Sequence, residues 1–385
     1  MNRNLKCRTA DLAKGTAVNL SSCTKRQIKR RTATTVALFA VVGLLAACGG
    51  SSDDDATADD SPEGPVSGTL RTFTYGDTID PLIMDPFGDE YPDLNVETAT
   101  FNSNAQAAAK IKGGFGTDVI EVCLDESSPL VDAGLLAPID TESVKGWDDL
   151  APAYRDADGV TVDGTTWMVP LSAGPHGLIY VTSAFPDGLD SWTALYDPEL
   201  AGRVALDGAS LTALSVTALS LGITDPMNMT PEQITQVRDY MLDHRDQFRT
   251  FAESDADMVN LFKSGEVVLS DGGRGTANKM EEGGVDVTWV APKEGGLSWI
   301  CGLGVSAESK NIAASYALIE HFLSPPMQVV TAELGYAITN PKALPLIPAA
   351  ERADADPAAL EGLIAEVEPA NPDEWDEAWQ QVQVG

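Results

Sequence analysis

The segment Asp118-Val119-Ile120-Glu121-Val122 is a short, mainly apolar run of the kind found in the buried strands of a parallel sheet. The alanine-rich stretch before it predicts a helix over 104–112, which ends at Gly113-Gly114. Strands that alternate with helices are typical of an α/β sheet. The alternation begins further upstream, with a strand predicted over 69–75, a helix over 81–90 and a strand over 94–99.

The second half of the chain continues this alternation. Thr230-Pro231-Glu232-Gln233 predicts a helix start, because threonine caps the first turn, proline suits it and Gln233 completes a capping box. Another helix is predicted from Ser254 to Ser264, ending at Gly265. The other predicted elements are strands over 266–270 and 286–290, a tight glycine-rich turn over 271–275, and helices over 312–323, 326–333 and 374–382.

The first 47 residues are predicted to be a targeting segment. A basic stretch ending at Lys29-Arg30-Arg31 precedes the apolar run 36–47, which stops at Cys48 behind small residues. Small residues before a cysteine are what a lipoprotein signal peptidase requires. Because a transmembrane helix needs about 20 apolar residues, this run is too short for a spanning anchor. We therefore predict a signal segment over 1–47, a lipid anchor at Cys48, a flexible linker over 48–67, and a location in the periplasm or on the outer face of the membrane.

The cysteines agree with export. Cys7 and Cys23 lie in the predicted signal segment, so Cys123 and Cys301 are the cysteines left beyond the lipid site. In an exported protein such a pair suggests a disulfide. Two buried free thiols are the alternative.

The charge balance excludes nucleic acid as a partner. The chain has 25 basic and 58 acidic residues, of which nine basic and one acidic residue lie in 1–47. Residues 48–385 therefore hold 16 basic against 57 acidic residues, a net charge of −41. A surface that binds phosphates must be positive. The acids keep an exported protein soluble or steer a cation toward a cleft, and their even spread favours solubility.

Catalytic motifs are missing from the sequence. His176, His244 and His321 are far apart, with no second ligand at metal spacing. The glycine-rich stretch 271–275 lacks the Lys-Ser/Thr of a phosphate-binding loop, and neither a Gly-x-Ser-x-Gly elbow nor a His-Glu-x-x-His motif occurs. We therefore expect a protein that is not an enzyme and needs no cofactor or metal.

Val285 to Trp289, Pro292-Lys293-Glu294-Gly295-Gly296 and Glu333-Leu334-Gly335-Tyr336 resemble segments of the periplasmic spermidine/putrescine-binding proteins. Ser191-Trp192-Thr193-Ala194-Leu195 extends the resemblance upstream, and it runs from Leu70 to the last helix. It implies an α/β, two-lobed periplasmic-binding-protein fold of type II with a hinge between the lobes. About 320 residues follow the linker, more than one core usually holds, which agrees with two lobes. The resemblance implies lobe 1 over 68–173 with 301–346, and lobe 2 over 174–300 with 347–385.

The resemblance also implies positions for ligand binding. It places Tyr75, Trp299 and Tyr336 at aromatic ligand positions of the family, and Asp77 at an acidic one. These residues suit an organic cation, whose buried charges need carboxylates and whose chain needs aromatic faces. Each has a structural alternative, such as core packing for the tyrosines or helix capping for Asp77.

Other cleft positions depart from the family. Cys301 stands where the family has a carboxylate, Cys123 where a hydroxyl is common, and Asp125 where an aromatic residue is found. Asp207 is what remains of an acidic pair, and Asp125 is a candidate to replace the lost charge. Arg274, beside the position of a missing tryptophan, opposes a cation and suits a carboxylate, unless it projects into water. For Asp125 the structural alternative is helix capping.

The function that follows is capture of a small organic cation, polyamine-like in shape, by a monomeric lipid-anchored receptor. Hinge closure around this solute is read by the membrane permease and ATPase of an ABC importer. An alternative ligand is a zwitterionic or anionic solute, such as an amino-acid derivative, with Arg274 as its partner. Two further alternatives are a lipid-anchored hydrolase and a sensor subunit that signals to a membrane kinase.

Overall fold

The computed structural model describes residues 61–76, 78–101 and 104–385. The predicted signal segment 1–47, the lipid site Cys48 and the predicted ligand residue Asp77 lie outside these residues. Within them, no helix combines the length and the apolar character needed to cross a membrane.

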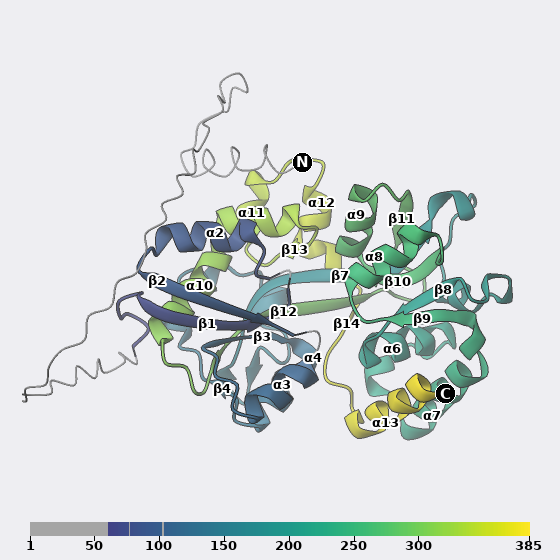
Figure 1. The fold of residues 1–385 in the computed structure, drawn as a ribbon, viewed down its shortest axis with the longest axis horizontal. Coiled ribbons are helices and arrows are strands. Elements are labelled where there is room, and N and C mark those ends of the chain that lie inside the picture. Colours follow the sequence, from purple (N-terminus) through teal and green to yellow (C-terminus); the bar gives the residue numbers. More distant parts are fainter. Residues whose placement is uncertain (1–60, 77, 102–103) are drawn as a thin grey trace, which may run out of the picture. The chain divides into compact units, whose positions relative to one another are not determined.

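The first lobe is built on three parallel strands, of which β1 (Gly68–Thr74) lies in the middle (Figure 1). β2 (Leu94–Thr100) and β3 (Val119–Cys123) pair with it on either side. All three predicted strands are confirmed, and each of their ends lies within one residue of the predicted position. The apolar residues of β3 are buried, as expected. The helices that connect and cover these strands are α2 (Pro81–Glu90), α3 (Asn104–Lys112), α4 (Leu124–Asp132), α10 (Ile312–Leu323) and α11 (Pro325–Glu333).

The second lobe repeats this plan. β8 (Val204–Asp207) is parallel to both β9 (Phe248–Ala252) and β10 (Leu269–Gly273). The predicted capping box is confirmed: the Gln233 backbone N–H donates to Thr230 Oγ1 at 3.3 Å, and the Thr230 N–H donates to Gln233 Oε1 at 2.9 Å. The helices of this lobe are α6 (Ser210–Ser220), α7 (Pro231–Asp243), α8 (Asp255–Ser264), α9 (Arg274–Glu282) and α13 (Pro372–Val384).

The glycine-rich stretch 271–275 differs from the prediction. We predict a strand over 266–270 followed by a tight turn, which is wrong, because β10 runs to Gly273 and α9 begins at once with Arg274. A Cβ on Gly272 would lie 2.6 Å from Ile179 Cδ1 on the neighbouring strand. Gly272 therefore serves close packing inside the sheet rather than a turn.

Two long antiparallel strands pass through both lobes. β7 (Val169–Val181) pairs with β10 of the second lobe, and β12 (Leu297–Ser306) pairs with β3 of the first. Because β7 and β12 also pair with each other, one sheet continues from lobe to lobe in the order β2-β1-β3-β12-β7-β10-β8-β9. Short strands on β7 or β12 complete it: β4 (Leu136–Ala137), β11 (Val287–Val290), β13 (Ala337–Ile338) and β14 (Ile364–Ala365). β5 (Thr161–Val162) and β6 (Thr165–Thr166) form a separate hairpin.

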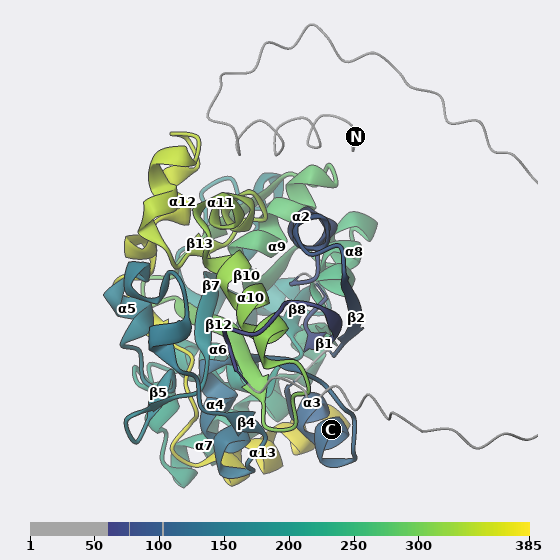
Figure 2. The same ribbon diagram turned by 90° about the vertical axis from the view of Figure 1, so that its left-hand side faces the viewer.

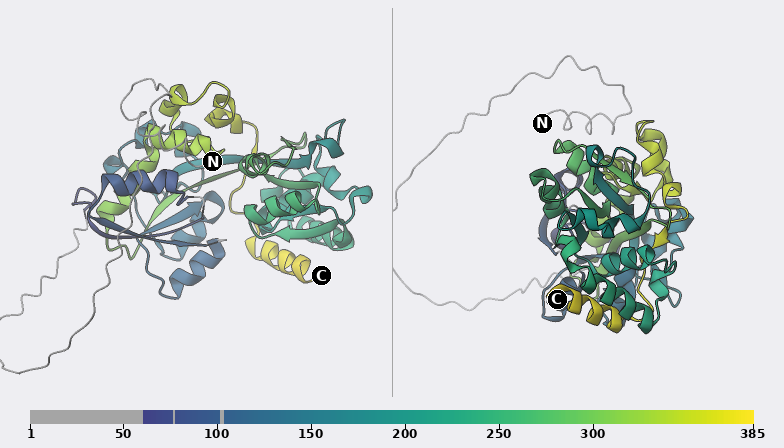
Figure 3. Two further views of the ribbon diagram at one scale, coloured as in Figure 1. Left: turned by 45° about the horizontal axis from the view of Figure 1, so that its top comes forward. Right: turned by 90° about the vertical axis from the view of Figure 1, so that its right-hand side faces the viewer.

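Each lobe has its own hydrophobic core. In the first lobe, α10 and α11 pack with α2 (Figure 2). Phe87 of α2 is fully buried in the same core as residues of α10. In the second, Trp192 and Trp375 are both at most 2% exposed, and α13 closes the core (Figure 3). The lobe boundaries stay predictions, but Ile347 and Ala355 pack with residues of α11 and β13. The chain after residue 346 therefore contacts the first lobe before it reaches α13.

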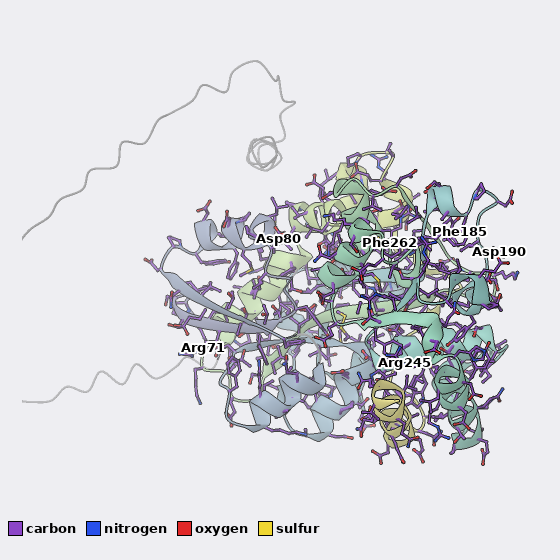
Figure 4. All side chains as sticks on the ribbon, turned by 45° about the vertical axis from the view of Figure 1, so that its right-hand side comes forward. Arg71, Asp80, Phe185, Asp190, Arg245 and Phe262 are labelled. Atoms are coloured by element: carbon purple, nitrogen blue, oxygen red, sulfur yellow. A yellow bond between two sulfur atoms is a disulfide. The ribbon has the colours of Figure 1, made fainter. Side chains whose placement is uncertain are left out.

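Two of the segments that carry the family resemblance meet in the second lobe. The Glu294 carboxylate accepts hydrogen bonds from Ser191 Oγ at 2.5 Å and from the Trp192 N–H at 3.2 Å. The Trp192 indole N–H donates to the Gly295 carbonyl at 2.8 Å. Close by, at the edge of the lobe in Figure 4, Asp190 pairs with Lys293 at 3.1 Å. These contacts hold the loop before β12 on the lobe, so we assign them a structural role.

A disulfide joins Cys123 of β3 to Cys301 of β12, two residues that stand opposite each other in the strand register. The sequence suggests this disulfide and leaves two free thiols as the alternative, and the structure contains the bond. It connects residues 178 positions apart in the chain.

We expect the double variant Cys123→Ser, Cys301→Ser to lose about 2–5 kcal/mol of unfolding free energy, because the bond restricts a long loop of the unfolded chain. Urea unfolding of the chain from residue 49 onward measures the change, with Ser183→Ala, a substitution of an exposed serine, as the control. Alkylation of both cysteines in the native, unreduced protein, located by peptide mass spectrometry, would show that the bond does not form.

Candidate functional site

A cavity of about 720 Å³ is lined by residues of both lobes. It lies at the carboxyl ends of the parallel strands: Tyr75 follows β1, Asp125 follows β3, Asp207 ends β8 and Arg274 follows β10. In open α/β sheets this edge is where ligands bind. The volume lies within the range of small-molecule sites, about 300–1,000 Å³.

The predicted ligand residues come together at this cavity. Its lining includes Tyr75, Cys123, Asp125, Asp207, Arg274, Trp299, Cys301 and Tyr336. Asp77, the ninth, lies outside the described residues. Their role toward a ligand stays a prediction, whereas their common location is a property of the fold.

Aromatic side chains form one wall of the cavity. The rings of Trp299 and Tyr336 meet edge to face, with centroids 5.5 Å apart. The Trp299 indole lies against the backbone of Gly174 on β7, where an added Cβ would be 2.5 Å from the ring. Tyr75 packs edge to face on Phe101 at 4.6 Å. Glycine at 174 therefore makes room for the indole that the sequence singles out.

The first lobe contributes a desolvated carboxylate. Asp125 lies in the first turn of α4, whose N-cap is Cys123, so the capping alternative for Asp125 is wrong. The cap of α2 is Asp80, which accepts the Leu82 N–H at 2.8 Å. Burial, together with the negative charge of Glu366, raises the pKa of Asp125 to about 7. At neutral pH this carboxyl group is therefore close to its midpoint.

The second lobe contributes Asp207, which accepts the Ala209 N–H at 2.8 Å. Its own backbone N–H donates to the fully buried Asp271 at 2.8 Å. Burial raises the pKa of Asp207 to about 7, with a further contribution from the charge of Asp271, while His176 lowers it. Asp125 on one lobe and Asp207 on the other thus each have a raised pKa.

The described lining of the cavity contains one arginine and one lysine, and each already has a carboxylate partner. Arg274 Nη2 lies 2.7 Å from Asp354 Oδ2, and its guanidinium stands 5.4 Å from the Trp289 ring. Lys279 Nζ lies 2.9 Å from Asp255 Oδ2. Arg274 therefore neither projects freely into water nor stands unengaged for a ligand carboxylate.

Among the polar residues of the cavity that were not predicted, three form buried hydrogen bonds that shape the site. Glu121 is buried in β3 and accepts the Tyr75 N–H at 2.8 Å and the Thr78 hydroxyl at 2.6 Å, so it holds the connection after β1. Its signal was a carboxylate inside an apolar strand. Glu366, from the segment after β14, accepts the Thr212 hydroxyl at 2.9 Å, and burial raises its pKa. His176 of β7 bonds Asp271 at 3.1 Å, a pairing with no local signal in the sequence.

Within residues 61–76, 78–101 and 104–385, no three His, Cys, Asp or Glu side chains are grouped so that they could hold a metal ion.

The raised pKa values of Asp125 and Asp207 predict opposite effects of pH on cation binding and on stability. Both carboxyl groups keep protons in the empty folded protein at pH values where the unfolded chain has lost them. Their contribution to stability is therefore present at low pH and lost as the pH rises toward about 7. Cation affinity follows the ionised form and rises over the same range.

Calorimetric titration and thermal unfolding at about pH 6, 7 and 8 test this linkage. We expect protons to be released on binding, detected as a dependence of the binding enthalpy on the buffer. The variant Asp125→Asn, Asp207→Asn should reduce both pH effects, and the part of the stability effect that remains comes from Glu126 and Glu366, whose pKa values burial also raises. An affinity that does not change with pH in the unaltered protein would contradict the assignment.

Comparisons with known proteins agree with the geometry. The spermidine/putrescine-binding periplasmic protein 1 of Haemophilus influenzae is 24% identical over 315 residues, covering 80% of this chain and 85% of that protein. A putative spermidine/putrescine ABC transporter structure from Listeria monocytogenes superposes with a TM-score of 0.73 at 24% identity, over 82% of this chain and 99% of its own. The PBP MotA of A. tumefaciens B6 in complex with glucopine has a TM-score of 0.68 at 18% identity, over 82% and 100%.

The fold and the cavity define a two-lobed periplasmic-binding protein, with the α/β class and the two lobes that the resemblance implies. Residues 83–362 match the model of the bacterial extracellular solute-binding proteins. The chain belongs to that family.

Proposed function

We propose that this protein is the substrate-binding component of an ABC importer and captures a small organic cation of polyamine-like shape in its interlobe cavity. The solute is released unchanged to a membrane permease, which an ATPase drives. Support comes from the family of the chain and from relatives named for spermidine and putrescine.

The observation that carries the proposal is the charge of the cavity. Asp125, Asp207 and Glu366 all have pKa values raised mainly by burial, so their ionised forms lack the solvation that water provides. A ligand ammonium group restores that stabilisation inside the cavity. Trp299 and Tyr336 offer ring faces to the carbon chain between such groups, and to the charges themselves.

Closure follows from the same contacts. The ligand is proposed to touch carboxylates of both lobes, and such a ligand binds the closed state more tightly than the open one. β7 and β12 would bend as the hinge. A ligand can shift the equilibrium between the open and closed states only by the difference in its affinity for the two states. Residues of both lobes must therefore contribute to binding in the closed state.

A zwitterionic or anionic ligand remains the second candidate, since a similar structure holds glucopine. Such a ligand would need Arg274, whose guanidinium is engaged by Asp354. The charge of the cavity therefore favours the cation.

The test is a thermal-shift and titration series on the chain from residue 49 onward, with diamines and triamines in one arm and amino acids and other carboxylates in the other. At 100 times Kd, a ligand that binds only the folded state stabilises it by about 2.7 kcal/mol, or about 4 °C for a chain of this size. We expect the amines alone to give this shift and to be recovered chemically unchanged.

Two variants complete this test. Trp299→Ala should weaken amine binding about tenfold or more, because it removes the aromatic face. Arg274→Ala should leave amine affinity within about threefold, because an exposed ion pair is worth about 0–1 kcal/mol. Binding of carboxylates but not amines, abolished by Arg274→Ala, would establish the second candidate instead, and turnover of any ligand would indicate an enzyme.

Export and a lipid anchor at Cys48 form the second part of the proposal, supported by the sequence pattern at residues 36–48. In cells fed radiolabelled palmitate, we expect Cys48→Ser to abolish labelling and to leave the protein uncleaved or released. Cys23→Ser, a matched cysteine variant upstream, should be labelled normally. A cleaved protein that carries no lipid in its unaltered form would overturn the anchor.

A further inference from the structure

A buried histidine stands in the wall of the cavity, on the strand that passes between the lobes. His176 belongs to β7 and is opposite Gly273 of β10 on one side and Leu297 of β12 on the other. It is 5% exposed, and its ring Nε2 lies 3.1 Å from Asp271 Oδ2. The pair therefore lies at the hinge, where both lobes meet the cavity.

Both carboxylate oxygens of the residue that pairs with His176 are hydrogen-bonded within the fold. Asp271 is fully buried, and its Oδ1 accepts the Asp207 backbone N–H at 2.8 Å while its Oδ2 bonds His176. A buried carboxylate is costly unless it is hydrogen-bonded and paired with positive charge. His176 supplies both, which makes it part of the charge balance of the cavity rather than an incidental core residue.

The surroundings of His176 are acidic. Burial alone lowers its pKa, but the hydrogen bond and charge of Asp271, together with the charges of Glu366 and Asp207, raise the pKa to about 9. At neutral pH the ring is an imidazolium, with both ring nitrogens protonated. Three carboxyl groups, from β10, from β8 and from the segment after β14, thus share one positive charge that belongs to the protein.

We propose that His176 is a specificity-determining residue: it is a resident cation that takes the place of one ligand ammonium group beside Asp271, Asp207 and Glu366. The cavity therefore selects organic cations with fewer charges, diamines over triamines and tetramines. The inference rests on the proposed function and adds to it the charge class of the ligand.

The physical reason is that the His176 imidazolium has two effects on the binding of amines. It reduces the negative field of the second-lobe carboxyl groups, and it repels an additional ammonium group placed near them. Because its partner is fixed by two hydrogen bonds and the strand is held in the sheet, it cannot move away to admit that group. A ligand therefore needs fewer positive charges to neutralise the remaining carboxylates, which include Asp125 of the first lobe.

The experiment measures Kd for putrescine, spermidine and spermine by calorimetry at about pH 7.5, in the unaltered protein and in three variants. The unaltered protein should prefer putrescine. His176→Gln keeps a hydrogen-bond donor near Asp271 but removes the charge, and should shift the spermidine-to-putrescine affinity ratio at least tenfold toward spermidine. His321→Gln, the same substitution at a partly buried histidine of the first lobe, should leave the ratio unchanged.

The decisive variant is His176→Gln with Asp271→Asn. It removes one positive and one negative charge, so the net charge of the site equals that of the unaltered protein and the preference for putrescine should return. A shift as large as that of His176→Gln alone would show that shape and not charge sets the preference, and would overturn the inference. So would a neutral His176 ring in nitrogen NMR spectra at about pH 7.5, well below the pKa that Asp271 sustains.

The two proposals fail in different ways. If the unaltered protein binds none of the three amines, the proposed function is wrong and this inference with it. If it binds spermidine or spermine more tightly than putrescine, the transport role stands and the role of His176 is overturned.

Discussion

The antiparallel pairing of β7 with β12 is the constraint on which the rest of the structure depends. Its ladder runs from the pair Leu297–His176 to the pair Leu303–Val169, and both strands continue into neighbours on either lobe. Because buried backbone groups must keep their hydrogen bonds, the lobes cannot separate and can only rotate as these strands bend. The same ladder brings His176 and Trp299 to the cavity, so hinge and binding wall are one element.

Buried charge is the second theme, and it sets stability against binding. Asp125 and Asp207 have raised pKa values because burial disfavours their ionised forms, so the empty cavity is a destabilised part of the fold. Contacts elsewhere, such as that of Glu294 with Ser191, hold the framework of the second lobe. A ligand of the right charge relieves the penalty that the fold maintains, and this difference is the source of its affinity.

Elements with local signals could be predicted from the sequence, whereas groups that act through distant partners could not. The capping box at Thr230 and the stop at Gly265 gave α7 and the end of α8. Helix α6, most of whose residues are buried, has no amphipathic period to detect. The resemblance placed Trp299 and Tyr336 at the cavity, but His176 depends on a residue 95 positions away and Glu366 on one 154 positions away.

The resemblance predicts that the cavity carries negative charge, but the disulfide shows that it does not predict where the charged groups lie. Cys301 occupies a position where the family has a carboxylate, and its bond to Cys123 makes that part of the wall neutral. Negative charge comes instead from the first turn of α4 and from the segment after β14, at Asp125 and Glu366, which interact with each other. Because the field in a low-dielectric cavity is the sum over all its charges, such a relocation preserves attraction for cations. Under the proposed function, it changes the side from which each ammonium group is held, and so a ligand of the same class need not be the same compound.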